Sequence, residues 1–328
     1  MITTTDGCRA SGAISLRRKF RRGLPRLCVL AVLGMPLAAC TNSKIILGPL
    51  YNQMDDQIRS EIIELGEFTD AQLMAFDQAV GTYHVWHRQS ELPRYAGLLQ
   101  EIADKVATSG NIGPDQVERW VKDAEELARA ARECHPLNFL VDTMRTLSDD
   151  QLNVIEQRYT AERSEHRERH ASRTPEQRVE RRLKNLQKWA GRMNVQLNPA
   201  QLAALGSTLR QQTSLSSQYY TLADAWTREV FRIARDQSAS EYTTRMREHM
   251  NARWTLLESA YPAQWQANRR LWQKTLHALI LSLSEEQRRN FSQWSSKMSD
   301  TVLAISRDEP SFQIGNDPGI GCLPDTSS

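Results

Sequence analysis

The sequence has few of the residues that interrupt helices or build disulfide-rich scaffolds. Its 328 residues include 15 glycines, 12 prolines and 5 cysteines, which excludes collagen-like and disulfide-scaffold proteins. Only one apolar run stands out, near the N-terminus, so the chain is not a multi-span membrane protein. An apolar content of 40% excludes a wholly disordered chain and leaves ample material for a buried core.

The chain also lacks the short motifs of common enzymes. It has no glycine-rich phosphate loop, no Gly-x-Ser-x-Gly elbow, no Cys-x-x-Cys pair and no clear nucleophile–base pair. Seven of the 42 basic residues and one of the 39 acidic residues lie in residues 1–39, so the remaining chain has a net charge of −3. We therefore predict a protein that is not an enzyme, needs no cofactor and binds no nucleic acid.

The first forty residues have the order of a secretory signal: a basic stretch, a short apolar stretch and a small-residue cleavage site. Leu37-Ala38-Ala39-Cys40 resembles a bacterial lipobox. The resemblance implies that residues 1–39 are removed and that Cys40 carries acyl chains such as palmitate. Thr41 occupies the position directly after Cys40, where an inner-membrane retention signal has Asp. This favours the periplasmic face of the outer membrane. Export by Sec is favoured over the twin-arginine route, because Arg21 interrupts the apolar stretch that the latter requires.

Two cysteines, Cys134 and Cys322, remain in the mature chain besides Cys40. The periplasm is oxidising, so these two could form one disulfide. Alternatively they stay as two thiols, since Cys322 lies in a Gly/Pro/Asp-rich tail. Both alternatives remain open from the sequence.

Helical spacing of apolar residues is found throughout the mature part, and strand-like alternation is not. For example, apolar residues at 291, 294, 298, 302 and 305 share one helical stripe. We predict an all-α, elongated bundle of about ten helices over 49–305, after a tether over 40–48 and before a flexible tail over 306–328. The expected helices are 50–65, 69–92, 93–107, 114–134, 137–146, 149–172, 175–194, 199–236, 240–259, 262–281 and 285–305, with a kink or restart at Pro93.

A local motif marks the start of many of these helices. A capping residue is followed three positions later by Gln, whose side chain can reach back to the cap residue's N–H and complete a capping box. Gly113 with Gln116 is a weaker copy. The five full copies are Thr69 with Gln72, Ser148 with Gln151, Thr174 with Gln177, Asn198 with Gln201, and Ser284 with Gln287. Their irregular intervals favour a bundle of unequal helices over a strict repeat.

The segment from Trp86 to Tyr95, read with the lipobox and the capped helices, resembles a family of bacterial lipoproteins of unknown function. The resemblance extends over residues 37–305 and transfers no catalytic residue. The capping boxes also resemble, more weakly, those of Spy-type periplasmic chaperones, which implies a helical surface that binds unfolded proteins.

The same segment holds the leading candidate site, a structural or partner-binding cluster of Trp86, His87, Arg88, Glu91, Arg94 and Tyr95. A buried charged network is the favoured interpretation, with Glu91 paired to Arg88, Arg94 or a more distant base. A weaker alternative is a metal site, because His84, His87 and Glu91 would share one face of a regular α-helix.

Three other features have ordinary interpretations. His166 and His170 have the spacing of zinc ligands but lie in a charged run typical of a solvated helix end. The basic run 178–188 could contact anionic lipid, but a solvated helix face is favoured. The eight Trp residues could line an aromatic groove, but packing between helices is favoured. We expect a lipid-anchored envelope protein that binds partners or unfolded clients. The alternatives are an accessory subunit of an envelope complex and a metal-dependent enzyme.

Overall fold

The computed structural model describes residues 44–108, 112–134 and 141–308, and these residues form helices without any β-strand. The predicted all-α class is therefore confirmed over this part of the chain. The predicted signal peptide, Cys40, Cys322 and most of the predicted tail lie outside it. The elements are α2 (Lys44–Asn52), α3 (Met54–Ile63), α4 (Asp70–Trp86), the π-helix η1 (His87–Glu91), α5 (Leu92–Thr108), α6 (Pro114–Glu133), α8 (Val141–Met144), α9 (Asp149–Ala171), α10 (Pro175–Arg192), α11 (Pro199–Gln211), α12 (Ser216–Arg235), α13 (Tyr242–Ala252), the 3-10 helix η2 (Arg253–Thr255), α14 (Leu256–Ala260), α15 (Pro262–Leu281) and α16 (Glu285–Ser306).

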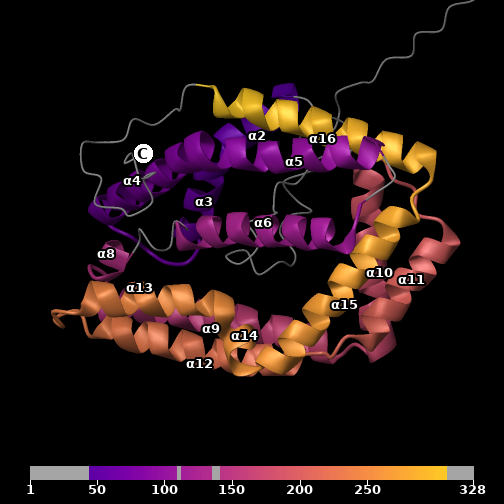
Figure 1. Cartoon of the computed structure of the whole chain (residues 1–328). Helices are drawn as coiled ribbons and strands as arrows, with labels where there is room; N and C mark the ends of the chain where they lie inside the picture. The colour runs from indigo at the N-terminus through magenta and orange to yellow at the C-terminus, as the bar shows by residue number, and fades with distance from the viewer. Residues whose placement is uncertain (1–43, 109–111, 135–140, 309–328) are drawn as a thin grey trace, which may run out of the picture.

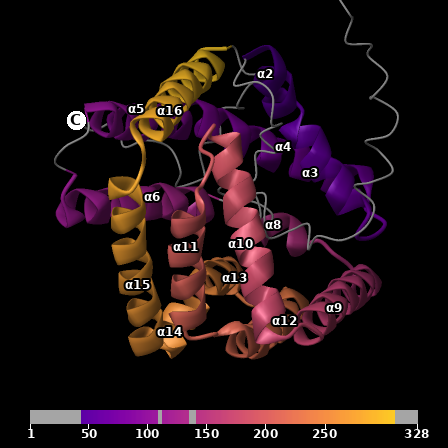
Figure 2. The same ribbon diagram turned by 90° about the vertical axis from the view of Figure 1, so that its right-hand side faces the viewer.

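Two layers of helices joined at one end make up the molecule (Figure 1). One layer contains α5 and α16 side by side with α2, and the other contains α9, α12 and α13. The helices α10, α11 and α15 run between the layers (Figure 2). The core is divided accordingly, with separate clusters in each layer and at the junction. None of the described helices is both long and apolar enough to cross a membrane.

The helices α5 and α16 approach closely because small side chains lie between them. Ala96 of α5 and Ser295 and Ser299 of α16 are buried. Ser295 Oγ donates to the Leu99 carbonyl at 2.7 Å, and Ser299 Oγ donates to the Ala96 carbonyl at 2.8 Å, so both buried hydroxyls are satisfied. The predicted stripe on α16 is also confirmed, since its apolar side chains pack into the core: Phe291, Trp294, Met298, Val302 and Ile305.

Several predicted helices are divided in the structure. The predicted helix 199–236 is two helices, α11 and α12, because Asn268 of α15 replaces the helical hydrogen bonds at Thr213. Its side-chain amide accepts from the Thr213 N–H and donates to the Thr213 carbonyl, both at 2.9 Å. The predicted helix 240–259 is interrupted by η2, and the predicted helix 50–65 is replaced by α2 and α3. Helix α2 begins at Lys44, inside the predicted tether, because Leu47 and Tyr51 pack against α5 and α16.

All five full capping boxes are confirmed. In each one the cap side chain accepts from the backbone N–H of the Gln, and the Gln side chain accepts from the backbone N–H of the cap residue. Gly113, as expected of a residue without a side chain, provides no such bond to α6.

Four of the capping glutamines also bond to one another across the fold, which local sequence does not reveal. Gln72 pairs with Gln151, and Gln201 pairs with Gln287, through two reciprocal amide hydrogen bonds of 2.9 to 3.3 Å in each pair. Each glutamine also donates to a backbone carbonyl two residues before its partner's cap: Thr146, Glu67, Ser282 and Gln196. The pairs therefore bring the N-termini of α4 and α9 together, and those of α11 and α16.

Gln201→Ala should lower the free energy of unfolding by about 2–3 kcal/mol, because a side chain that is 3% exposed loses both its local and its long-range hydrogen bonds. Gln177→Ala is the matched control: it breaks the same local box but no pair, and should cost below about 1 kcal/mol. Urea denaturation measures both. Equal costs would show that the long-range pairing adds no stability.

Candidate functional site

The predicted cluster comes together at the π-helical turn η1. Pro93 has no N–H to donate, and its ring would clash with the carbonyl four residues earlier in a regular helix. The wider turn accommodates both effects, so α4 continues into α5 in nearly the same direction. The predicted restart at Pro93 is confirmed in this form, since α5 begins at Leu92.

Among the described residues, Arg88 is the largest fully buried side chain, with 1% exposed. Its Nη1 donates to the Ile305 carbonyl at 2.8 Å, and its Nη2 donates to Asn52 Oδ1. The guanidinium carbon lies 4.9 Å from the ring centroid of Tyr51. Because Ile305 is in the last turn of α16, the partial negative charge of that helix end compensates part of the buried positive charge. Arg88 thus joins η1 to α2 and α16.

Three tyrosines and Trp86 surround His87. The Tyr51 hydroxyl and His87 Nδ1 share a hydrogen bond of 2.9 Å, and the rings of Tyr83 and Tyr95 have centroids 5.6 and 5.5 Å from the imidazole. Burial lowers the pKa of His87 to about 3 and raises the pKa of each tyrosine above its ordinary value. Around neutral pH the cluster therefore holds an uncharged imidazole and uncharged phenols.

Glu91 is paired with Arg94, as the sequence predicted. The carboxylate is 2% exposed, and Arg94 Nη1 donates to its Oε1 at 2.7 Å. The second oxygen, Oε2, is buried and makes no hydrogen bond to the described residues, and the same holds for the Tyr95 hydroxyl. Burial raises the pKa of Tyr95, and the nearby Glu91 charge raises it further. The predicted pairing with Arg94 is therefore observed, although the Arg94 side chain is 49% exposed, and the hydrogen bonds of Arg88 go to Ile305 and Asn52.

The metal alternative for His84, His87 and Glu91 is not supported. No three His, Cys, Asp or Glu side chains in the described part of the chain are placed to hold a metal ion. The expected common face assumed a regular α-helix, whereas the π-turn lies between the histidines and Glu91 and changes the register. The His84 ring instead packs 4.5 Å from the Tyr51 ring centroid.

The buried imidazole predicts how stability depends on pH. The unfolded chain binds a proton at His87 near pH 6.5, whereas the folded chain does so only near pH 3. The contribution of His87 to stability should therefore be fully present above pH 6.5 and fall as the pH drops toward 3, by about 2–3 kcal/mol at pH 4.5. Urea denaturation across this range measures the slope. His87→Gln should make this slope shallower, and an unchanged slope would place the responsible groups elsewhere.

His166 and His170 lie far from this cluster, at the end of α9. The ion pair of Glu165 with Arg169 has the predicted i, i+4 spacing. The helix end is not wholly solvated, however, because His166 Nδ1 and the Tyr220 hydroxyl of α12 share a hydrogen bond of 2.8 Å.

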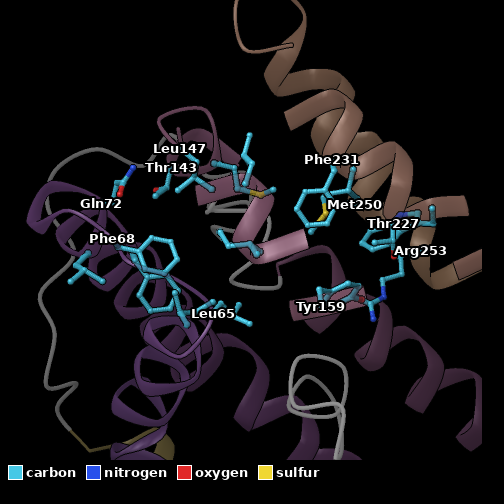
Figure 3. Close-up of a pocket in the computed structure, with 18 residues that line it drawn as sticks. Leu65, Phe68, Gln72, Thr143, Leu147, Tyr159, Thr227, Phe231, Met250 and Arg253 are labelled. Carbon is cyan, nitrogen blue, oxygen red and sulfur yellow. The ribbon is translucent and has the colours of Figure 1, made fainter. Parts of the chain in front are cut away.

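An apolar pocket lies between the two layers, and it is the second candidate site (Figure 3). It has an empty volume of about 950 Å³, part of it open to solvent, and almost all of its exposed lining is apolar. Phe68 and Leu65 line one side, and Phe231 and Met250 line the other. The cavity proper, about 130 Å³, is smaller than the usual pocket for a small-molecule ligand. Of the eight tryptophans only Trp226 lines it, so this pocket is not the alternative groove of tryptophans; its lining is mainly aliphatic with Phe and Tyr.

Cys134 ends α6, packs against Tyr83 and Trp86, and is disulfide-bonded. Every other cysteine of the chain lies outside the described residues. The pairing with Cys322 therefore stays a prediction, made on the grounds that Cys8 and Cys28 belong to the predicted signal and Cys40 to the lipobox.

The sequence did not identify the pocket, because each lining residue looks like an ordinary core position on its own helix. It also did not identify the Ile305 carbonyl as a partner of Arg88, since the two residues are separated by 217 positions. Tyr51 and Asn52 were not among the predicted site residues, and their contacts with the cluster give them a structural role.

Comparison with known proteins gives one finding. A family model, DUF6279, described as a family of unknown function, matches residues 67–261, more than half of the chain. The matched range includes η1, the Arg94 and Tyr95 positions and most of the pocket. No curated protein and no solved structure matches the chain.

Proposed function

The chain belongs to DUF6279, a family of unknown function, and we propose that it is a lipid-anchored, non-catalytic envelope protein that binds apolar polypeptide segments. The observation that supports this proposal is the pocket between α3–α4 and α9–α12. An open pocket with such an apolar lining favours burial of apolar side chains from a partner or an unfolded client, because each side chain removed from water contributes to binding.

The structure around the pocket supports a preformed site. Gln72, of the Gln72–Gln151 pair, lines one end, so the hydrogen bonds that join α4 to α9 also fix the distance across the opening. Leu147 and Leu152 line the pocket and are themselves part of the buried core. A pocket that needs no rearrangement loses less conformational entropy on binding.

The lipid anchor rests on Leu37–Cys40 and on the short connection to the folded part. Only three residues separate Cys40 from Lys44, where α2 begins, so the chain between them extends at most about 14 Å. Acyl chains on Cys40 would therefore hold α2 close to the membrane. The proposed location is the periplasmic face of the outer membrane.

Leu73 and Met74 provide a matched test. Leu73 lines the pocket, whereas its neighbour Met74 is 65% exposed and does not. Leu73→Glu should weaken client binding about tenfold or more, because an apolar side chain of the client would have to be buried beside a charged carboxylate. Met74→Glu adds the same charge outside the pocket and should bind normally.

The measurement is suppression of aggregation of reduced, unfolded α-lactalbumin by the mature chain carrying Cys40→Ser, with thermal unfolding to confirm that both variants fold. Equal activity of the two variants would refute the pocket as the binding site, and no activity in any form would refute client binding.

A further inference from the structure

Basic side chains without acidic partners gather where α9 ends and α10 begins. This α9–α10 basic cluster consists of His166, His170, Arg173, Arg178 and Arg181, all half-exposed or exposed. Arg178 Nη1 donates to the Arg173 carbonyl, which holds the two arginines beside each other. No carboxylate of the described residues forms an ion pair with any of the five.

Glu162, Glu168 and Glu176 lie in the same stretch of sequence and form no ion pair within the described residues. Three other acids close to the cluster pair with other bases. These ion pairs are Asp224 with Arg163 and Arg167, Glu165 with Arg169, and Glu180 with Lys184. The positive charge also affects the two histidines. Burial lowers the pKa values of His166 and His170, and the surrounding arginines lower both values further. A region with this potential attracts anions.

The cluster is built by three helices and is more than a charged run on one of them. Tyr220 of α12 bonds to His166 Nδ1 at 2.8 Å, and its ring centroid lies 5.7 Å from that of His170. Both imidazoles are thereby held against α12. Helix α10 begins at the same place, and the partial positive charge of its N-terminus faces the arginines, with Glu176 as the acid in its first turn.

We propose that the α9–α10 basic cluster binds a phosphate group. Arginine guanidinium groups match phosphate oxygens in charge and in hydrogen-bond geometry, and imidazoles add donors when an anion favours their protonated form. The cluster lies at the opposite end of the molecule from α2 (Figures 1 and 2). If α2 is held at a membrane by the proposed anchor, the phosphate comes from a source facing away from that membrane.

Two sources share this chemistry, a soluble phosphate compound and a phospholipid headgroup, and binding experiments separate them. The probes are pyrophosphate, measured by calorimetry, and phosphatidylcholine vesicles with or without phosphatidylglycerol, measured by sedimentation. Both use the mature chain with Cys40→Ser. Binding of pyrophosphate but not of phosphatidylglycerol vesicles assigns a soluble compound. Binding to phosphatidylglycerol vesicles, with or without competition by pyrophosphate, assigns a headgroup.

The double variant Arg173→Ala/Arg181→Ala should weaken this binding by about tenfold or more. Arg129→Ala/Arg289→Ala is the matched control, since it removes two exposed, ion-paired arginines and the same total charge. The proposal is overturned if neither probe binds, if the cluster variant binds like the unchanged protein, or if the control loses as much. The aggregation assay with the Leu73 variant tests the pocket separately. Failure of the phosphate proposal can therefore be told apart from failure of the proposed client binding.

Discussion

Arg88→Ala is expected to lower the free energy of unfolding by about 3–5 kcal/mol. The substitution leaves the Ile305 carbonyl and Asn52 Oδ1 without their donor in a buried site, and it opens a cavity beside the Tyr51 ring. Because these contacts join α2, η1 and α16, their loss should separate the two ends of the described chain. Urea denaturation followed by circular dichroism measures the change.

Arg129→Ala is the control for removal of an arginine. Its side chain is 64% exposed on α6 and pairs with Glu133 at i, i+4, so its loss should cost below about 1 kcal/mol. Asn52→Ala should fall between the two, because it removes one of the acceptors and leaves the guanidinium in place. If Arg88→Ala unfolds at the same urea concentration as Arg129→Ala, the buried guanidinium does not stabilise the fold.

Cys40→Ser is expected to abolish membrane attachment. The proposed acyl chains supply the stable part of the binding free energy, and no described helix could span the bilayer in their place. Fractionation after a salt and urea wash should find the unchanged protein in the outer membrane and the variant in the soluble fraction or as an unprocessed precursor.

Cys134→Ser is the control for loss of a cysteine, and it should leave the protein in the membrane fraction. A Cys40→Ser protein that still fractionates with washed outer membranes would contradict the lipobox interpretation. Unlike the Arg88 experiment, this test does not depend on the stability of the fold.

The helix starts could be predicted because their chemistry is local. A cap residue and a glutamine three positions later need only each other's backbone, so all five boxes appear where the sequence placed them. The all-α class follows from the same signals together with helical spacing. Helix ends were less predictable: the α11–α12 division at Thr213 depends on Asn268, which is 55 positions away.

The candidate cluster was predicted in composition but not in geometry. The pairing of Glu91 with Arg94 follows from their closeness in sequence, whereas the position of Arg88 depends on α16. The metal alternative, which the described residues do not support, assumed one helical register, whereas the π-turn before Pro93 changes that register.

Sequence alone therefore decided the all-α class and the starting points of the five capped helices, and it predicts the lipid anchor, since each depends on residues within a few positions of one another. Tertiary structure decided which glutamines pair, where the Arg88 guanidinium is satisfied and that an apolar pocket opens between the layers. The physical reason is that burial and hydrogen-bond satisfaction depend on groups brought from distant positions. A glutamine that caps its own helix carries no local sign of the second glutamine, 79 or 86 residues further on, to which it will bond.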